Sequence, residues 1–193
     1  NEDLVSAPEQ FSFFYRDKEL KFISDNGVFS KKMIDFGSRV LLDAIIIDES
    51  KSSLLDVGCG YGTFGIALKS VYPFLQIDMV EISKATLACG LLVPSPIPEH
   101  DITKKAIENE LIKQDYAGIS YEKCKIPENI DINVYIEDAR QTVQNLEDNY
   151  YDAIFLDPFS QNMAPELFSL DFFREFRRVI KDRGIIATYT SSA

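Results

Sequence analysis

The sequence predicts an α/β fold with a doubly wound, mostly parallel sheet, and two observations carry that prediction. Short apolar runs alternate with helical apolar patterns along most of the chain, which is the order of βα units. The first buried run, at residues 54–57, leads into three glycines at alternate positions: Gly58, Gly60 and Gly62. Glycine permits a positive φ and lets a ligand approach the backbone, so this strand, turn and helix are typical of a nucleotide-binding site.

The remaining elements are expected on both sides of this turn. A strand pair over residues 11–23, turning near residues 16–18, comes first. Ser38 is expected to N-cap the next helix, and Gly184 to follow the last helix as its C-cap. The apolar stripe of the first helix is Val40, Leu41, Ala44 and Ile45. Strands are expected at 54–57, 75–81, 133–136, 152–157 and 185–190, and helices at 64–71, 83–92, 141–146 and 169–181.

We expect one domain over residues 1–193, with two additions to the minimal fold. Residues 1–36 are rich in aromatic side chains and are expected to form an N-terminal arm or lid. Residues 93–131 open with three prolines and read as an insertion, which we assign to the mouth of the substrate site.

The amino-acid composition indicates which kinds of molecule the protein can bind. The net charge is −11, which would repel the phosphates of a nucleic acid and favours a small-molecule substrate. The one compact basic patch is the helical stripe of Arg174, Arg177, Arg178 and Lys181, either an RNA contact or simply a solvated face. Three scattered cysteines and one histidine make a metal site improbable and a reduced cytoplasmic setting the default. No apolar run reaches the length that spans a membrane.

The glycine turn carries a family resemblance. Residues 56–62, D-V-G-C-G-Y-G, resemble motif I of the class I S-adenosylmethionine (SAM) methyltransferases, which implies a Rossmann-like fold and SAM as the cofactor. Glu81 follows the next strand, where an acid accepts hydrogen bonds from ribose hydroxyls. Asp138 is followed by alanine, as in many SAM enzymes, and implies a contact with the adenine amino group. The resemblance assigns SAM binding to Asp56, Gly58, Cys59, Gly60, Gly62, Glu81, Ile82, Asp138, Ala139 and Asp157.

The same fold normally continues through a sixth and a seventh strand. This sequence ends soon after the fifth, so we expect the C-terminal hairpin to be missing and strand 185–190 to form an edge of the sheet. A tight βα turn without a ligand remains the alternative interpretation of the glycines.

The fourth strand ends at Asp157, our candidate catalytic residue. In this fold the acceptor lies beside that strand end, where a carboxylate can accept N–H bonds from an amine and stabilise the positive charge that develops on its nitrogen. Phe159, two residues on, can stack on a planar base. The D-P-F order resembles, without matching, the [D/N]-P-P-[Y/F] motif of amino-methylating nucleic-acid enzymes. A structural carboxylate at a strand end is the alternative.

Two RNA methyltransferase families are similar to different parts of the chain. Residues 155–168, F-L-D-P-F-S followed by N-M-A-P-E-L-F, and A-T-Y-T-S-S at 187–192 resemble MnmC, which methylates the aminomethyl group of the wobble uridine in certain tRNAs. The segment G-V-F-S at 27–30 resembles RsmC-like RNA-guanine methyltransferases, which makes Phe29 a candidate substrate contact beside the cofactor pocket. An aromatic residue of a lid or of the core is the alternative interpretation of Phe29. Alanine before Pro165 and phenylalanine at 168 depart from the MnmC pattern.

Three functions follow as hypotheses. The first is a SAM-dependent N-methyltransferase that modifies a tRNA wobble uridine. The second is a methyl- or aminopropyl-transferase acting on a small amine, although the G-G-G-D-G turn of spermidine synthases is absent. The third is a SAM-binding subunit without catalytic activity of its own.

Overall fold

The computed structural model describes residues 9–24, 30–81, 132–135, 137–158, 161 and 164–189. The predictions made for Phe29, Ile82, Phe159, the helix at 83–92 and the insertion at 93–131 lie outside these residues. Within the described ranges, no helix is both long and apolar enough to cross a membrane.

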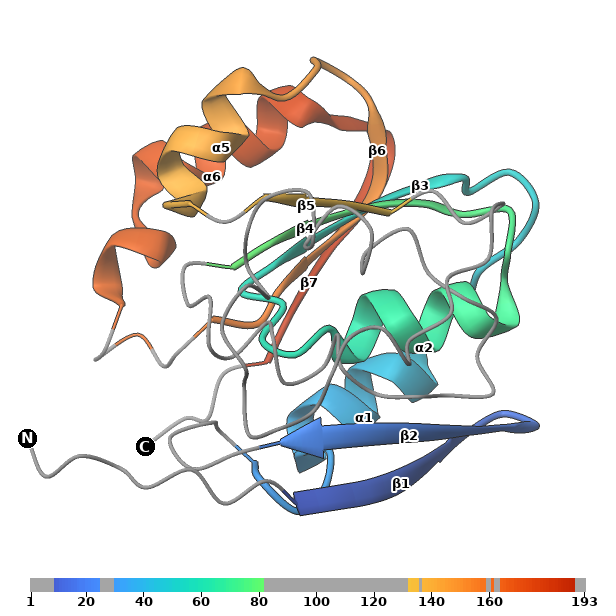
Figure 1. The fold of residues 1–193 in the computed structure, drawn as a ribbon. Helices are drawn as coiled ribbons and strands as arrows, with labels where there is room; N and C mark the ends of the chain where they lie inside the picture. The colour runs from blue at the N-terminus through green and yellow to red at the C-terminus, as the bar shows by residue number, and fades with distance from the viewer. Residues whose placement is uncertain are drawn as a thin grey trace, which may run out of the picture.

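A five-stranded parallel sheet forms the centre of the molecule (Figure 1). Its order is β5-β4-β3-β6-β7, and every neighbouring pair is parallel. The strands are β3 (Ser53–Val57), β4 (Gln76–Val80), β5 (Ile132–Tyr135), β6 (Tyr151–Leu156) and β7 (Ile180–Thr188). The doubly wound α/β prediction is confirmed, and β7 lies at an edge of the described sheet as expected.

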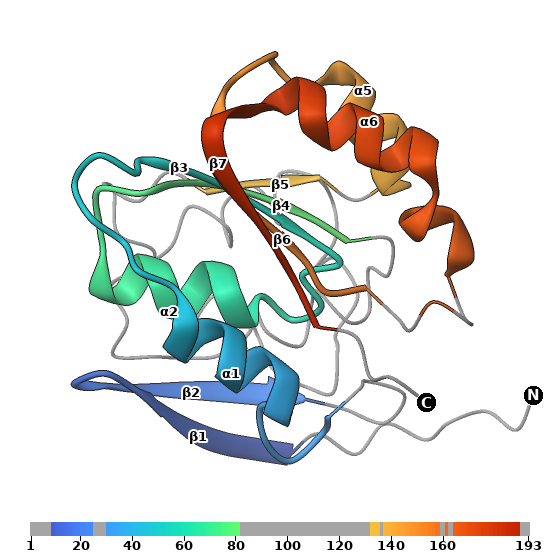
Figure 2. The same ribbon diagram turned by 180° about the vertical axis from the view of Figure 1, so that it is seen from behind.

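Helices cover both faces of the sheet, as Figures 1 and 2 show. Helices α1 (Phe36–Ala44) and α2 (Thr63–Val71) lie on one face, and α5 (Ala139–Asn145) and α6 (Leu170–Val179) lie on the other. Helix α2 is buried along most of its length, because Phe64, Ala67 and Leu68 pack in the core on its face of the sheet. On the opposite face the buried residues of α6 are Phe172, Phe176 and Val179.

The N-terminal strand pair forms a second small sheet outside α1 and α2 (Figure 2). Strands β1 (Glu9–Tyr15) and β2 (Lys18–Ser24) pair in antiparallel register, and Arg16 at the turn adopts a positive φ of 55°. The hairpin is tied to α1, because the Tyr15 hydroxyl donates to the Leu42 carbonyl at 3.2 Å. It also packs on the glycine turn, where the ring of Tyr61 contacts that of Phe22 at a centroid distance of 5.6 Å.

Helix α1 begins earlier than the sequence indicated. Its N-cap is Asp35, whose carboxylate accepts the Ser38 backbone N–H at 3.1 Å, so Ser38 lies inside the first turn. The prediction of Ser38 as N-cap was therefore wrong. The predicted stripe was also displaced: Leu42 is fully buried, whereas Val40 is exposed.

Helix α6 ends at Val179, and Ile180 is its C-cap. The Ile180 N–H still bonds to the Phe176 carbonyl, and the chain then joins β7 at once. Gly184 therefore lies inside β7, and the prediction that it caps the helix was wrong. A side chain there has no room, because a Cβ on Gly184 would lie 2.4 Å from the Ile180 Cγ1.

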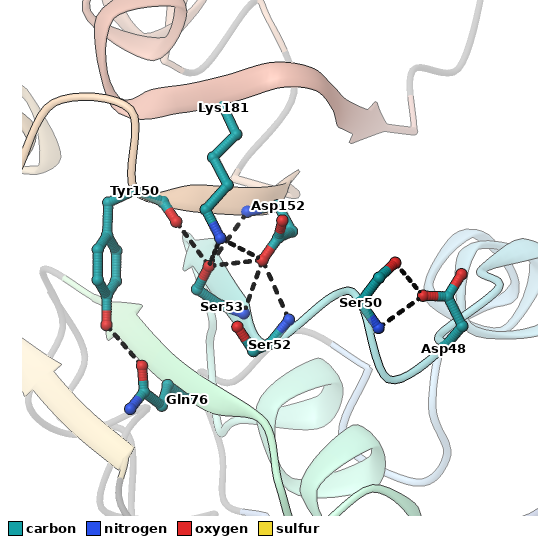
Figure 3. Close-up of polar contacts among 8 residues, drawn as sticks. All are labelled: Asp48, Ser50, Ser52, Ser53, Gln76, Tyr150, Asp152 and Lys181. Carbon is teal, nitrogen blue, oxygen red and sulfur yellow. Dashed lines mark hydrogen bonds and ion pairs between the residues drawn. The ribbon is translucent and has the colours of Figure 1, made fainter.

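A polar cluster joins three strands at the end of the sheet where β3 and β6 begin (Figure 3). The Asp152 carboxylate accepts the backbone N–H groups of Ser52 and Ser53 at 3.0 and 3.1 Å, and the Lys181 ammonium at 2.8 Å. The Ser53 hydroxyl donates to the Tyr150 carbonyl at 2.6 Å. Burial raises the pKa of Asp152, but the hydrogen bonds outweigh it and hold that pKa below its ordinary value. The cluster fixes β7 to the centre of the sheet.

Candidate cofactor and acceptor site

The glycine turn between β3 and α2 is built from three left-handed residues. The φ angles are 76° at Gly58, 57° at Gly60 and 89° at Gly62, values that side chains rarely adopt. The N–H groups of Gly58 and Cys59 donate to the Val80 carbonyl at 2.9 and 3.1 Å, which ties the turn to the end of β4. Gly62 then N-caps α2 without any side-chain cap. The turn therefore presents backbone at the carboxyl edge of the sheet.

Gly58 is required for a second reason. A Cβ at this position would lie 2.7 Å from the Pro158 Cα and 2.9 Å from its nitrogen. Pro158 follows Asp157 at the end of β6, and the Asp157 N–H donates to the Val57 carbonyl at 3.1 Å. The glycine turn and the candidate acceptor end of β6 are thus in direct backbone contact.

Two acids lie against the turn. Glu81 is 7% exposed and its Oε2 accepts the Gly60 N–H at 2.9 Å. Asp56 is fully buried, and its Oδ2 accepts the Gly65 N–H at 3.3 Å from the first turns of α2. Its other oxygen, Oδ1, has no hydrogen-bond partner among the described residues. Burial, with the charges of Asp157 and Glu81 added, raises the pKa of Asp56 well above its ordinary value.

Asp138 and Ala139 lie after β5 at the same edge of the sheet. Asp138 N-caps α5, accepting the Arg140 backbone N–H at 2.9 Å and its Nε at 3.0 Å. The hydrogen bond from the Arg140 side chain holds the pKa of Asp138 below its ordinary value. The carboxylate is ionised and fixed in place, and its contact with adenine stays a prediction.

Asp157 lies half-buried at the carboxyl end of β6 and is held by a residue far away in the sequence. The Ser38 hydroxyl of α1 is 2.9 Å from the Asp157 Oδ2, and the same Oγ is 2.5 Å from the Asp35 Oδ2. The pKa of Asp157 is raised to about 6, mainly by burial and also by the charge of Asp35, while the Ser38 hydrogen bond opposes this rise. The sequence did not identify Asp35 or Ser38 as site residues. The spacing D-x-x-S was the available signal, but it indicates only a helix cap.

An aromatic residue follows the strand next to β6. Leu156 pairs with Thr188 in the register of β6 and β7, so the next residues, Asp157 and Tyr189, end neighbouring strands. The Tyr189 ring lies over Gly37 of α1, where a Cβ would be 2.4 Å from the ring. Tyr189 is 42% exposed and is a third residue near the site, after Asp35 and Ser38, that sequence reasoning missed.

The predicted site residues Asp56, Gly58, Gly60, Gly62, Glu81 and Asp157 come together at one edge of the sheet. Cys59 belongs to the same turn, but its thiol is buried, which raises the pKa of that thiol well above its ordinary value. Within the described residues, no group of three or more histidine, cysteine or acidic side chains could hold a metal ion.

The arrangement fits an adenosyl cofactor that carries a positive sulfonium. The left-handed glycines leave backbone exposed to a ligand, and Glu81 stands at the end of the adjacent strand, where ribose hydroxyls bind in doubly wound folds. Asp157 adds a carboxyl group beside the turn, which suits a cation, whereas the raised pKa of the buried Asp56 makes it a weaker source of negative charge. Glu81, Gly58, Gly60 and Gly62 are the residues that would hold the nucleoside side of SAM.

Most of the basic side chains in the predicted stripe bond to other groups of the protein. The Arg178 guanidinium donates to the carbonyls of Leu146 at 2.9 Å and Val143 at 2.7 Å, and pairs with Glu175 at 2.9 Å. Lys181 belongs to the Asp152 cluster, and Arg174 pairs with Asp171 at 2.7 Å in an exposed position. The stripe therefore offers less positive surface than its sequence indicates.

Two family models match adjacent parts of the chain. Residues 100–193 match a family described as S-adenosyl-L-methionine-dependent methyltransferase, and residues 19–92 match the methyltransferase small domain.

Among curated relatives, an uncharacterised Bacillus subtilis protein, YbxB, is 44% identical over 41% of this chain and 39% of its own length. The ribosomal RNA small subunit methyltransferase C of Pseudomonas paraeruginosa is 34% identical over 47% of this chain and 27% of its own length. A polyamine aminopropyltransferase of Prochlorococcus marinus is 31% identical over 76% of this chain and 43% of its own length. The chain thus spans less than half the length of these relatives.

Solved structures share the fold. The 16S rRNA N2 G1207 methyltransferase RsmC of T. thermophilus, solved with AdoMet and guanosine, superposes with a TM-score of 0.50 and 20% identity, over 78% of this chain and 33% of its own. The MnmC2 protein of Aquifex aeolicus gives 0.51 and 23%, over 95% of this chain and 60% of its own. The two family matches, the sheet order and the glycine turn together identify a domain with the fold of class I SAM-dependent methyltransferases.

Proposed function

We propose that this domain methylates an amino nitrogen, and that its acceptor is the aminomethyl group of the wobble uridine in tRNA. The observation that carries the proposal is the position of Asp157. Its carboxylate lies at the end of β6, in backbone contact with the cofactor turn through Pro158, and is oriented by the Ser38 hydroxyl at 2.9 Å.

The residues of the site suit methyl transfer to an amine. Bound SAM supplies a methyl group on a positively charged sulfur, so the protein has to position the nucleophile and remove its proton. Asp157 can accept an N–H bond from the amine, which directs the nitrogen lone pair, and its negative charge stabilises the ammonium that forms. With a pKa of about 6, this carboxyl is mostly ionised at neutral pH and can also act as a base.

The tRNA acceptor is supported by the residues around Asp157. The pattern at 155–168 resembles the MnmC family, and a relative that aligns over 47% of this chain is named as a ribosomal RNA methyltransferase. With a net charge of −11, phosphate contacts have to be few. Arg174 and Arg177 are the exposed members of the α6 stripe and would supply them. We therefore expect weak tRNA binding with a shallow dependence on salt.

A small amine is the second candidate acceptor. The aminopropyltransferase relative aligns over 76% of this chain, and the acidic balance suits a cationic polyamine better than a nucleic acid. A carboxylate such as Asp157 would hold a polyamine nitrogen as well as an aminomethyl group.

A transfer assay separates these functions. The protein is incubated with methyl-labelled SAM and, in separate reactions, with tRNA carrying aminomethyluridine, unmodified tRNA and a panel of polyamines. Label only in the aminomethylated tRNA supports the proposal, and label in free amines supports the second candidate. If no acceptor is labelled although calorimetry shows SAM binding, the domain is a non-catalytic SAM-binding subunit. Asp157→Ala is the control, because it should lose about 10²–10³ in rate while it keeps SAM affinity.

A further inference from the structure

The Ser38 hydroxyl lies between two carboxyl groups from different parts of the chain. Its Oγ is 2.5 Å from the Asp35 Oδ2 and 2.9 Å from the Asp157 Oδ2. A serine hydroxyl has one proton to donate and two lone pairs to accept with. If both carboxyl groups were ionised, the hydroxyl proton could be donated to only one of them. The other contact would then place two oxygen atoms together with no hydrogen between them. One additional proton, held by either carboxyl group, completes a continuous hydrogen-bonded chain.

The surroundings favour such a shared proton. Ser38 is 4% exposed, and Asp157 is half-buried. Asp56 on β3 adds a further carboxyl group that interacts with Asp157, and Glu81 beyond β4 interacts with Asp56. Among the described residues, neither Asp35 nor Asp157 forms an ion pair with a lysine or arginine. Neighbouring acids without a cation weaken the ionised form of Asp157, so its carboxyl can take up a proton during the reaction.

The hydrogen-bonded series of Asp157, Ser38 and Asp35 leads from the site toward the protein surface. Asp157 lies at the acceptor end of β6, whereas Asp35 is the N-cap of α1 and is partly exposed. The Tyr189 ring over Gly37 covers the same turn of α1. A proton that enters at Asp157 can therefore leave through Ser38 and Asp35 without crossing the cofactor turn.

We propose that Asp157, Ser38 and Asp35 form a relay that carries the acceptor's proton from the site to solvent. The proposal rests on the amine methyltransferase function proposed above. The nitrogen lone pair forms the bond to the methyl carbon, and the carbon–sulfur bond breaks with its electron pair going to sulfur. The new ammonium then gives one proton to Asp157, Ser38 accepts that proton while it donates its own to Asp35, and Asp35 releases it to water. Ser38 and Asp35 act through Asp157 and are positioning and relay residues.

The test compares Ser38→Ala, Ser38→Thr and Asp35→Asn with the wild type in the transfer assay between pH 5 and 9. Ser70→Ala is the matched control, since the Ser70 hydroxyl bonds to the Ala67 carbonyl at 2.7 Å within α2. We expect Ser38→Ala to lower kcat by about 10²-fold, the lower range for general acid–base catalysis, with KM and SAM affinity little changed. Ser38→Thr keeps a hydroxyl and should recover most of the rate. Asp35→Asn leaves an amide that cannot take up the proton, so it should lower kcat as Ser38→Ala does.

A second measurement tests the relay independently of any acceptor. Carboxyl carbons of aspartate are labelled with ¹³C, and the resonances of Asp35 and Asp157 are followed by NMR as the pH changes. Because Ser38 donates to Asp157, the Asp157 resonance should titrate at a different pH in Ser38→Ala than in the wild type. Equal kcat and pH profiles for Ser38→Ala and Ser70→Ala, or unchanged titrations in Ser38→Ala, would refute the relay. Failure of the proposed function gives a different result, because the wild type itself would then label no amine.

Discussion

Replacing Gly58 with alanine tests the contact between the cofactor turn and the end of β6. The new Cβ would lie 2.7 Å from the Pro158 Cα and 2.9 Å from its nitrogen, and both are backbone atoms that no rotamer change can move. The left-handed φ of 76° costs alanine about 1–2 kcal/mol. Displacing the backbone adds about 1–3 kcal/mol, as overpacking does in a core. A loss of about 2–4 kcal/mol is therefore expected, after the small gain from a stiffer unfolded chain.

Gly62→Ala is the matched control. Its φ is also left-handed, at 89°, but its Cβ would meet the ends of two flexible side chains, the Ile66 Cδ1 at 2.9 Å and the Met79 Cε at 3.2 Å. We expect the control to lose about 1–2 kcal/mol, since those side chains can move. For a chain of this size, each kcal/mol lowers Tm by about 2–4 °C. Thermal unfolding followed by circular dichroism measures both variants, and an equal drop in Tm would refute the role assigned to Pro158.

Three further predictions concern the cofactor turn, the acceptor carboxyl and the strand cluster. Gly60→Val places a branched side chain at a φ of 57° in the turn, so SAM affinity measured by calorimetry should fall; unchanged affinity would remove the turn from the cofactor site. Asp157 has a folded pKa of about 6, above its ordinary value of about 4, so ionising it weakens the fold as pH rises across that interval. Asp157→Asn should therefore show a flatter dependence of Tm on pH from 4 to 7, and the same slope as the wild type would contradict the assigned burial. Lys181→Met removes the ion pair with Asp152 and should cost about 1 kcal/mol at pH 7, whereas Arg174→Met, whose pair is exposed, should leave Tm unchanged. Because the pKa of Asp152 is lowered on folding, its contribution is present above the ordinary aspartate pKa, and the difference should shrink as pH falls below about 4.

The sheet and the cofactor turn could be predicted because their signals are local. The apolar runs and the glycines of residues 54–62 fix strand, turn and helix within one short segment. Parallel strands then bring Glu81 and Asp157 to the same edge without any knowledge of their partners.

The rest depended on contacts between distant segments. Asp35 and Ser38 are both good capping residues, and the choice between them is settled in the structure, where the Ser38 hydroxyl turns inward to Asp157. Arg178 and Lys181 looked like surface charges on a helix, but their partners lie on α5, β6 and neighbouring segments. The size of the positive surface could not be derived from the spacing of arginines alone.

The bond between Ser38 and Asp157 spans 119 positions of the sequence, and this has a consequence for how the protein is made. During synthesis from the N-terminus, the cofactor turn emerges complete with β3, α2 and β4, whereas the acceptor carboxylate emerges much later with β6. Closing so long a loop is a slow, late event in folding. Until then the Ser38 hydroxyl of α1 lacks its Asp157 partner, and the Tyr189 ring does not yet cover Gly37. The proposed cofactor half of the site is thus assembled before the proposed acceptor half, and a nascent chain halted between them would lack the Asp157 carboxylate.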